Sequence, residues 1–281
     1  MIEQIGIVAA GTMGNGIAQV CAAAGLSVTM TDISDAALTR GMSVVTGSLE
    51  RLVNKQKMTD ADRQAALKRI ATTTDSSKLA DCDLVIEAAT ENEDLKIKIL
   101  KDLCTKLRPS ALLATNTSSI SITKLAAVTD RPDRFIGMHF FNPVPLMALL
   151  ELIRGLQTSD DTHAKAAEFA KRIGKVAVTA KNSPGFAVNR ILCPMINEAI
   201  FVLQEGLASM EEIDAGMKLG ANHPIGPLAL ADLVGLDTLL AVMNVFYSDF
   251  KDPKYRPAPL LQEMVDAGYL GRKSGRGFYK Y

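Results

Sequence analysis

Short apolar runs alternate with amphipathic stretches over the first 180 residues of the chain. Apolar runs bounded by turn-forming residues are typical of strands, and amphipathic stretches with the helical period are typical of helices. Their alternation predicts a mostly parallel sheet with helices on both faces. The predicted strands are residues 5–10, 26–31, 83–88, 111–115, 134–139, 149–154 and 175–180, and the predicted helices are residues 15–24, 34–56, 60–70, 92–107, 121–128 and 162–173.

The pattern changes in a turn-rich break at residues 181–185, beyond which it is almost wholly helical. Residues 186–205 predict one long apolar helix, which Pro194 is expected to kink. Ser209 and Glu212 have the spacing of a capping box that begins another helix. Residues 228–250 predict one or two more helices, with Gly235 as a break. We therefore predict an α/β domain at residues 1–183 and a smaller all-helical C-terminal domain at residues 184–281.

The composition is that of a globular protein without a strong net charge. Hydrophobic residues make up 48% of the chain, and 31 basic residues balance 31 acidic ones. The balance leaves no net field to attract nucleic acid or an acidic membrane, although a local basic patch could bind a small anion. No apolar run reaches the roughly 18–20 residues that span a bilayer. The first residues enter a strand without a signal peptide, so we expect a complete cytoplasmic protein.

The four cysteines have no CxxC spacing, so we expect buried thiols in a reducing compartment and no metal site. Residues 191–203 and 236–246 are apolar on more than one helical face. Helices of this kind are usually buried on more than one side. The helical part therefore either packs only against the sheet domain or forms a two-fold homodimer, and we predict the dimer.

A glycine-containing loop, residues 9–14 (AAGTMG), joins the first predicted strand to the first helix. In a G-x-G-x-x-G loop, the second glycine lets the backbone approach a dinucleotide's pyrophosphate and the third permits close helix–strand packing. Gly11 and Gly14 have these two places, whereas Ala9 replaces the first glycine, a change we expect to be mild. Asp32 ends the second strand, near the spacing expected of the carboxylate that binds the adenosine ribose. These features predict a Rossmann-type domain that prefers NAD to NADP; the alternative is an ordinary tight turn beside a solvent-facing Asp.

Histidine suits proton transfer in alcohol oxidation because it titrates near working pH. Of the three histidines, His163 begins a polar helix and His223 lies in a turn. His139 ends a predicted strand, at the carboxyl edge where open α/β sheets bind ligands. The residues alone leave open whether His139 is catalytic or a core or turn histidine.

Three motifs follow one another in a characteristic order: NTSS at residues 116–119, GMHFFNPVP at 137–145 and SPGFAVNR at 183–190. Together they resemble the short-chain L-3-hydroxyacyl-CoA dehydrogenases, and within them the bacterial 3-hydroxybutyryl-CoA dehydrogenases. The resemblance extends to residues 271–279 and so covers essentially the whole chain. It implies reversible, NAD-linked interconversion of (S)-3-hydroxyacyl-CoA and 3-oxoacyl-CoA on short acyl chains, with hydride transfer to or from nicotinamide.

The resemblance also implies the catalytic residues. His139 is the general base in oxidation and the acid in reduction, Glu151 is its partner carboxylate, and Ser118 and Asn189 hydrogen-bond the reacting oxygen. A hairpin-like return after residues 142–145 would bring His139 and Glu151 together. Without the resemblance, Glu151 would be interpreted as an exposed strand acid and residues 116–119 as a loop that caps a helix.

The ligand contacts implied by the resemblance are more numerous. Ser48 and Lys55 match family contacts to coenzyme A, and Lys55 forms a basic cluster with Arg51 and Lys57 that suits ligand phosphates. A charged, solvated helix face is the alternative for such lysines, and it applies to Lys96 and Lys273 as well. The implied cofactor contacts are Ala9, Ala10, Gly11, Thr12, Met13, Gly14, Asp32, Glu91, Lys96, Ser118, Asn142 and Lys273.

Two other functions compete with an acyl-CoA dehydrogenase. Dehydrogenases of free 3-hydroxy acids also join a Rossmann domain to a helical one, but commonly place a lysine at the reacting oxygen. A non-catalytic NAD-binding relative would keep the fold without turnover. The His139–Glu151 pair argues against the first. The presence of all four candidate catalytic residues, His139, Glu151, Ser118 and Asn189, argues against the second.

Overall fold

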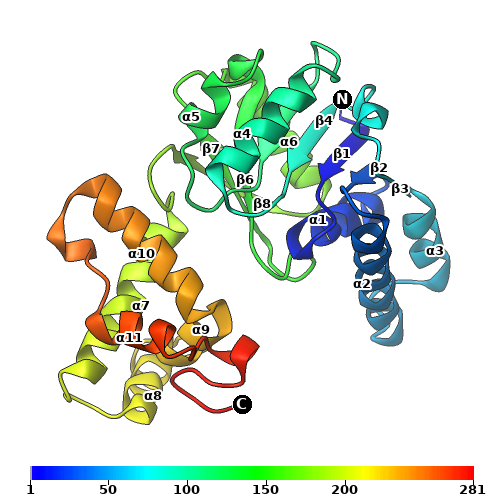
Figure 1. Ribbon diagram of the computed structural model, residues 1–281. Coiled ribbons are helices and arrows are strands. Elements are labelled where there is room, and N and C mark those ends of the chain that lie inside the picture. The colour runs from blue at the N-terminus through cyan, green and yellow to red at the C-terminus, as the bar shows by residue number, and fades with distance from the viewer. Residues whose placement is uncertain (1) are drawn as a thin grey trace. The chain divides into compact units, whose positions relative to one another are not determined.

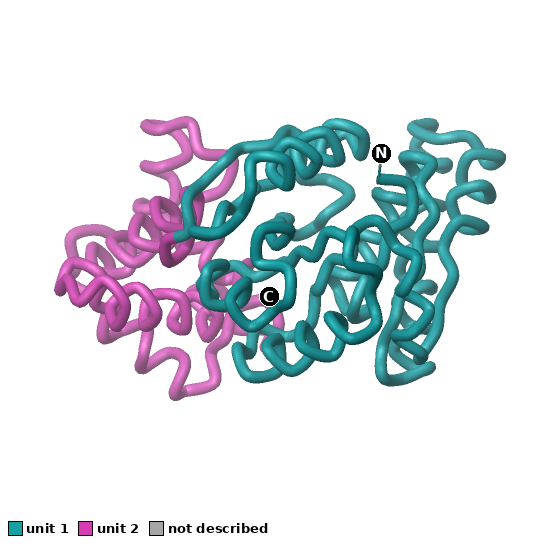
Figure 2. The backbone as a smooth tube through the Cα atoms, turned by 90° about the horizontal axis from the view of Figure 1, so that it is seen from above, with its two compact units in different colours: residues 1–182 teal, residues 183–281 magenta. Residues whose placement is uncertain are grey.

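The computed structural model describes residues 2–281, which divide into two compact units. The first unit ends at Asn182 and the second runs from Ser183 to Tyr281 (Figure 2). The first contains a sheet with helices, and the second contains helices followed by a short C-terminal tail (Figure 1). This arrangement confirms the predicted fold class of a mostly parallel α/β domain followed by a helical one.

Eight strands form one sheet in the first unit, in the order β3-β2-β1-β4-β5-β6-β7-β8. Neighbouring strands are parallel except for β6 and β7, which are antiparallel. The strand order reverses between β1 and β4, and open α/β sheets bind ligands at the carboxyl ends of such strands. The strands are β1 (Gln4–Val8), β2 (Ser27–Thr31), β3 (Ile70–Thr73), β4 (Leu84–Glu87), β5 (Leu112–Thr115), β6 (Phe135–Phe140), β7 (Leu149–Arg154) and β8 (Val176–Lys181).

The helices of the first unit connect these strands and cover both faces of the sheet (Figure 1). Ser34, Thr59, Asn92, Ser121 and Ser159 each accept a hydrogen bond from a backbone N–H at the start of the following helix. Such caps are worth about 1 kcal/mol each and mark where a helix begins. The helices are α1 (Thr12–Ala23), α2 (Asp35–Asn54), α3 (Asp60–Lys68), α4 (Glu93–Cys104), α5 (Ile122–Ala127) and α6 (Asp160–Arg172).

The two faces of the central strands differ in chemistry. On one face, apolar side chains such as Ile86 and Met138 join the large core formed with α1 and α6. Successive strand residues point to opposite sides of a sheet. The other face, which contacts α4 and α5, therefore carries a row of buried polar side chains near the strand ends. This row consists of Glu87 on β4, Thr115 on β5, His139 on β6 and Glu151 on β7. Buried polar groups are expensive unless they are paired, so this row marks the candidate site.

Several predicted boundaries are corrected by the structure. β1 ends at Val8 rather than at residue 10, and α1 begins at Thr12 rather than at residue 15, so the first loop is tighter than expected. The short edge strand β3 is missing from the predicted strands, and only its first residue, Ile70, lies in the predicted helix 60–70. Ile70 is the one buried residue of this strand, and one buried residue carries no strand periodicity.

The second unit contains α7 (Val188–Gln204), α8 (Met210–Gly220), α9 (Pro227–Val234), α10 (Leu236–Phe250) and α11 (Pro259–Asp266) around their own apolar core. The capping box at Ser209 is confirmed, and so is the break at Gly235, which has a φ of 100°. Helix α7 continues through Pro194. Among the described residues no single helix is long and apolar enough to cross a membrane; α9 and α10 pass that test only as a pair bent by 97°.

Two buried acids hold the C-terminal tail. The Asp232 carboxylate accepts hydrogen bonds from the backbone N–H groups of Phe278 and Tyr279, both at 2.9 Å, and from the Tyr281 hydroxyl at 3.1 Å. The Asp214 carboxylate accepts one from the Tyr279 hydroxyl at 2.9 Å and also caps the start of α9. The tail is therefore attached to α8 and α9 through defined polar contacts.

The cysteines are free thiols, and Cys21, Cys82 and Cys193 are buried as predicted, whereas Cys104 is half-buried. Burial raises the pKa of the Cys82 thiol to about 11 and that of the Cys193 thiol to about 12. Thiols held in the protonated form are poor nucleophiles, so these cysteines belong to the core rather than to the chemistry.

Candidate active site

The loop between β1 and α1 is shaped by a left-handed residue. Ala9 has a φ of 83°, a region that disfavours residues with a Cβ. The expectation that alanine is a mild replacement at this place is therefore wrong, because the position favours glycine conformationally. A Cβ built on Gly14 would lie 1.8 Å from the Ala9 carbonyl oxygen, so residue 14 must be glycine. A Cβ on Gly11 would meet nothing within 4 Å, which leaves the space in front of α1 open for a ligand.

Asp32 stands beside this loop, where its Oδ2 accepts a hydrogen bond of 2.9 Å from the Ala10 N–H. Next to it is a cavity of about 310 Å³ whose lining includes the apolar side chains of Ile33, Leu95 and Ile99. Ile33 is 99% exposed, which is unusual for so large an apolar side chain. A flat aromatic base beside a carboxylate suits such a cavity, so these residues fit the adenosine half of NAD. Sequence reasoning found Asp32 but missed the apolar lining.

His139 and Glu151 lie directly opposite each other in the antiparallel register of β6 and β7. The His139 Nδ1 and a Glu151 Oε2 are 2.8 Å apart, and the two residues are only 6% and 0% exposed. Because an ionised carboxylate only accepts, Nδ1 donates, and this fixes the tautomer and orientation of the imidazole. The Phe141 ring packs on the imidazole with a centroid separation of 4.4 Å. The expected return of the chain is confirmed, and Glu151 is not an exposed strand acid.

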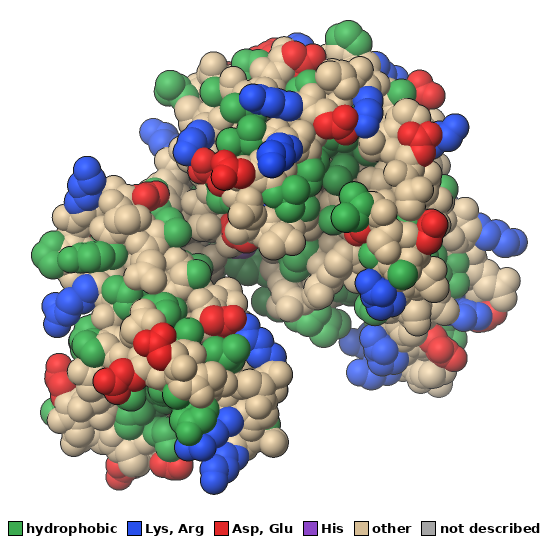
Figure 3. Space-filling view, viewed as in Figure 1, with side chains coloured by type: hydrophobic (Ala, Val, Ile, Leu, Met, Phe, Trp, Pro, Cys, Tyr) green, Lys and Arg blue, Asp and Glu red, His purple; other side chains and the backbone are tan. Residues whose placement is uncertain are grey.

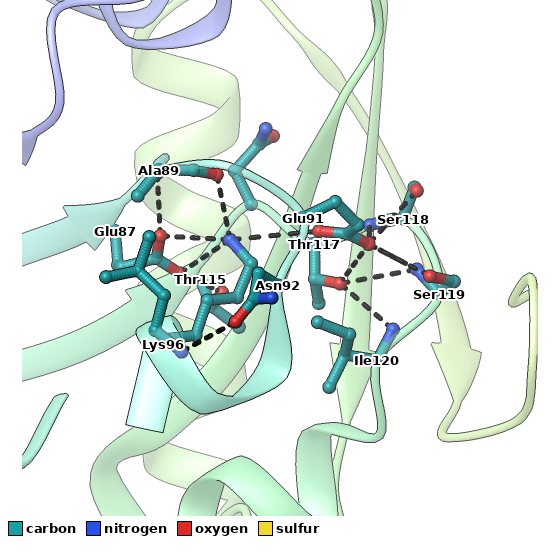
Figure 4. A network of polar contacts seen from close by, with 12 residues as sticks. Glu87, Ala89, Glu91, Asn92, Lys96, Thr115, Thr117, Ser118, Ser119 and Ile120 are labelled. Carbon is teal, nitrogen blue, oxygen red and sulfur yellow. Dashed lines mark hydrogen bonds and ion pairs between the residues drawn. The ribbon is translucent and has the colours of Figure 1, made fainter. Parts of the chain in front are cut away.

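Ser118 lies in the loop after β5, and this loop is tied to Glu91 (Figure 4). A single carboxylate oxygen, Glu91 Oε1, accepts from the Thr117 hydroxyl at 2.6 Å and from the backbone N–H groups of Ser118 and Ser119 at 2.9 and 3.1 Å. The hydroxyls of both serines also donate to it. Burial raises the pKa of the Glu91 carboxyl, but the Thr117 hydrogen bond and the Lys96 charge outweigh burial and lower it. An ionised Glu91 therefore organises the loop that carries Ser118.

Lys96 is fully buried, so the interpretation of this residue as a solvated surface lysine is wrong. Its Nζ lies 2.9 Å from each carboxylate oxygen of Glu87 and donates to the Ala89 carbonyl at 3.1 Å (Figure 4). Glu91 Oε2 is 3.8 Å away. Sequence reasoning missed Glu87. The available signal was its position, an acid that ends a buried strand at the same carboxyl edge as His139.

A second cavity, of about 280 Å³, lies between α1, α2 and residues 142–146. Four residues predicted as ligand contacts line it together, namely Thr12, Ser48, Lys55 and Asn142. Arg51 and Gln19 also line it, and Gln19 is only 3% exposed although its side chain is polar. Lys and Arg side chains gather at the lower end of α2 in the view of Figure 3, the end where the helix stops at Asn54. The cavity thus combines a basic rim with a lining that is largely apolar, since Val44, Leu52, Val144 and Leu146 also line it.

The two remaining predicted residues lie in the second unit. Asn189 is half-buried in the first turn of α7. Lys273 lies in the C-terminal tail, and its Nζ forms an ion pair with the carboxylate of Asp237 at the start of α10. The Lys273 side chain is exposed, and its ion pair with Asp237 orients it.

Comparisons with known proteins identify the family. Residues 4–183 match the NAD binding domain of 3-hydroxyacyl-CoA dehydrogenase, and residues 185–281 match the C-terminal domain of the same family. The chain is 54% identical to the 3-hydroxybutyryl-CoA dehydrogenase of Bradyrhizobium diazoefficiens, over 100% of this chain and 96% of that protein. It is 48% identical to that of Clostridioides difficile, over 99% of each.

A solved structure agrees with these matches. The (S)-3-hydroxybutyryl-CoA dehydrogenase from Ralstonia eutropha superposes with a TM-score of 0.98 at 66% identity, over 100% of this chain and 99% of that one. The predicted family, the predicted NAD cofactor and the predicted class of oxidoreductase are confirmed. The chain is therefore a member of the 3-hydroxyacyl-CoA dehydrogenase family, with that family's NAD-binding domain followed by its C-terminal domain.

Proposed function

We propose that this protein interconverts (S)-3-hydroxybutyryl-CoA and acetoacetyl-CoA with NAD, and that His139 transfers the proton. The observation that carries the proposal is the buried pair of His139 Nδ1 and Glu151 Oε2, 2.8 Å apart at the carboxyl edge of the sheet. The names of relatives that match over their whole length support the short acyl chain.

Oxidation of a secondary alcohol removes a hydride from carbon and a proton from oxygen. Bound NAD supplies the hydride acceptor, and NADH the donor in the reverse direction. His139 accepts the hydroxyl proton during oxidation and returns it during reduction. Glu151 holds the imidazole in one orientation and stabilises its positive charge after proton uptake, as a buried carboxylate does in other general-base pairs.

The other proposed residues bind and orient. Ser118 and Asn189 donate hydrogen bonds to the substrate oxygen, where negative charge develops in the reduction direction. Ser48 and Lys55 bind coenzyme A at the cavity beside α2, and the neighbouring Arg51 adds positive charge for its phosphates. The residue 9–14 loop, Asp32, Glu91, Lys96, Asn142 and Lys273 hold NAD.

The C-terminal unit has two proposed tasks. First, it supplies Asn189 and closes over the bound substrate. Second, it forms a homodimer. Exposed apolar side chains on its mutually contacting helices α7, α8 and α9 support the second task; they are Ile191, Leu219, Leu233 and Val234. Large apolar side chains exposed on neighbouring helices are often buried at protein interfaces.

The test of the chemistry is a His139→Gln variant assayed with acetoacetyl-CoA and NADH. We expect turnover to fall by about 10²–10⁴-fold, because a glutamine cannot exchange the proton. The affinity for NADH, measured by fluorescence titration, should stay unchanged. His163→Gln is the matched control. His163 is a half-buried histidine on α6, and its Nε2 lies 2.8 Å from the Thr179 hydroxyl on β8.

The same assay separates the competing functions. A dehydrogenase of free 3-hydroxy acids would oxidise NADH faster with acetoacetate than with acetoacetyl-CoA, and a non-catalytic relative would oxidise it with neither. Near-normal turnover by His139→Gln would rule out the proposed proton transfer even if acetoacetyl-CoA proved to be the substrate.

A further inference from the structure

The Glu87 carboxylate is a buried group with hydrogen bonds to both of its oxygens, outside the proposed catalytic pair. It is 0% exposed, and each of its oxygens lies 2.9 Å from Lys96 Nζ. The Thr115 hydroxyl donates to Oε2 at 2.6 Å, and the Ala89 N–H donates to Oε1 at 2.6 Å. The register of β4 and β5 puts Glu87 directly opposite Thr115, so strand pairing itself sets this geometry.

Stability alone gives little reason for such a pair. Desolvating two charges costs about as much as their attraction returns, and apolar residues of similar size often serve a core equally well. The pair also lies at β4, next to the point where the strand order reverses and open sheets bind ligands. Its position therefore suggests a role in the site rather than in the core.

Lys96 connects Glu87 to the loop that carries Ser118. One ammonium group stands between two carboxylates, bound closely by Glu87 and 3.8 Å from Glu91 Oε2. Glu91 uses its other oxygen, Oε1, to hold Thr117, Ser118 and Ser119. Figure 4 shows the continuous row of contacts from Glu87 through Lys96 and Glu91 to the serines.

The balance of these charges determines where Glu91 points. The negative charge of Glu87 holds Lys96 close to Glu87. Glu91 Oε1 then accepts the hydrogen bonds of the loop that carries Ser118. Without the Glu87 charge, Lys96 loses its closest anion and is drawn to Glu91, because an uncompensated charge in a buried place is strongly unfavourable. Glu91 must then turn toward Lys96, and the backbone N–H groups of Ser118 and Ser119 lose their acceptor.

We propose that Glu87 is a positioning residue of the active site, which acts through Lys96 and Glu91 to hold Ser118 in place before the substrate binds. The inference rests on the proposed role of Ser118 at the substrate oxygen. It adds a function for a residue that touches neither the substrate nor its reacting atoms.

The direct test is amide hydrogen exchange at Ser118 and Ser119 in the ligand-free protein. In Glu87→Gln we expect these two amides to exchange at least about ten times faster, because their acceptor turns away. Thr115→Val is the matched control: it removes a buried hydrogen bond to the same carboxylate but keeps the charge. It should lower the melting temperature without speeding exchange at the two serines. Equal exchange in the two variants would overturn the proposal.

Kinetics give an independent measure. At saturating NADH, Glu87→Gln should lower kcat/KM for acetoacetyl-CoA by about 10- to 100-fold, the size of effect expected when a reacting group is misplaced. In a Ser118→Ala background the same change should cost no more than about a factor of two, because the group that Glu87 positions is already gone. Fully additive losses would refute action through Ser118. If Ser118→Ala alone left kcat/KM unchanged, the proposed function of Ser118 would fail, while the exchange experiment would still judge Glu87.

A second variant tests the proposal even if Glu87→Gln does not fold. Glu87→Leu combined with Lys96→Met replaces the buried ion pair by apolar side chains and leaves no unpaired charge. It should fold and exchange at Ser118 and Ser119 at close to the wild-type rate, since no ammonium group remains to draw Glu91 away from the loop. Fast exchange in this variant would overturn the proposal.

Discussion

At the scale of single residues, the dinucleotide loop combines an unfavourable residue with an obligatory one. Ala9 takes a left-handed conformation in which its carbonyl oxygen faces Gly14, and Gly14 has no Cβ to obstruct it. The strain at Ala9 is local, because its N–H still donates to the Thr31 carbonyl at 2.8 Å. A more suitable residue at position 9 should therefore stabilise the protein without moving the loop.

We expect Ala9→Gly to raise the free energy of unfolding by up to about 1 kcal/mol. The gain from relieving the left-handed alanine exceeds the entropy that glycine adds to the unfolded chain. Ala10→Gly is the matched control, since Ala10 is buried and its substitution only removes a methyl group and adds chain entropy. Urea unfolding of the two variants measures the difference, and a loss of stability in both would contradict the assigned strain.

At the scale of elements, the site is made by strand ends that meet at one edge of the sheet. Glu87 and Thr115 end β4 and β5, His139 is the last residue but one of β6, and the sheet places all three on one face. The second unit shows the same principle with helices and a tail, where Asp232 of α9 accepts from two successive backbone amides of the tail. One side chain there determines the course of a whole segment.

We expect Asp232→Asn to destabilise the second unit by about 1–3 kcal/mol. An amide can accept from Phe278 or from Tyr279, but its NH₂ group then faces the other backbone donor. The melting temperature should fall by several degrees, about 2–4 °C per kcal/mol. The control is Asp266→Asn, at the exposed end of α11, which should change the melting temperature by less than about 2 °C. A melting temperature equal to that of the control would show that the tail is held in another way.

At the scale of the whole molecule, the proposed homodimer can be tested by measuring the mass of the protein in solution. Leu219 is 87% exposed, and with Ile191 and Leu233 it leaves apolar surface on the helical unit. Sedimentation equilibrium should give twice the mass of one chain, and Ile191→Glu should shift the population toward monomer. Leu156→Glu, at an even more exposed apolar position in the first unit, should not. A wild-type protein that sediments as a monomer would rule the dimer out.

The sequence by itself determined the features that depend on neighbouring residues. Helix period, cap chemistry and turn chemistry are local, so the sequence predicts the features that depend on them. These are the alternation of apolar and amphipathic stretches, the capping box at Ser209, the break at Gly235 and the glycine loop. The motifs around His139 and Ser118 added the family.

Only the tertiary structure decided which distant residues meet. It showed Glu151 opposite His139, Lys96 buried against Glu87, and residues of α1, α2 and 142–146 around one cavity. It also showed that Ala9 is left-handed, which no periodicity reveals. The physical reason is that burial and pairing depend on strand register and on which helix covers which face, and these follow from contacts between segments far apart along the chain.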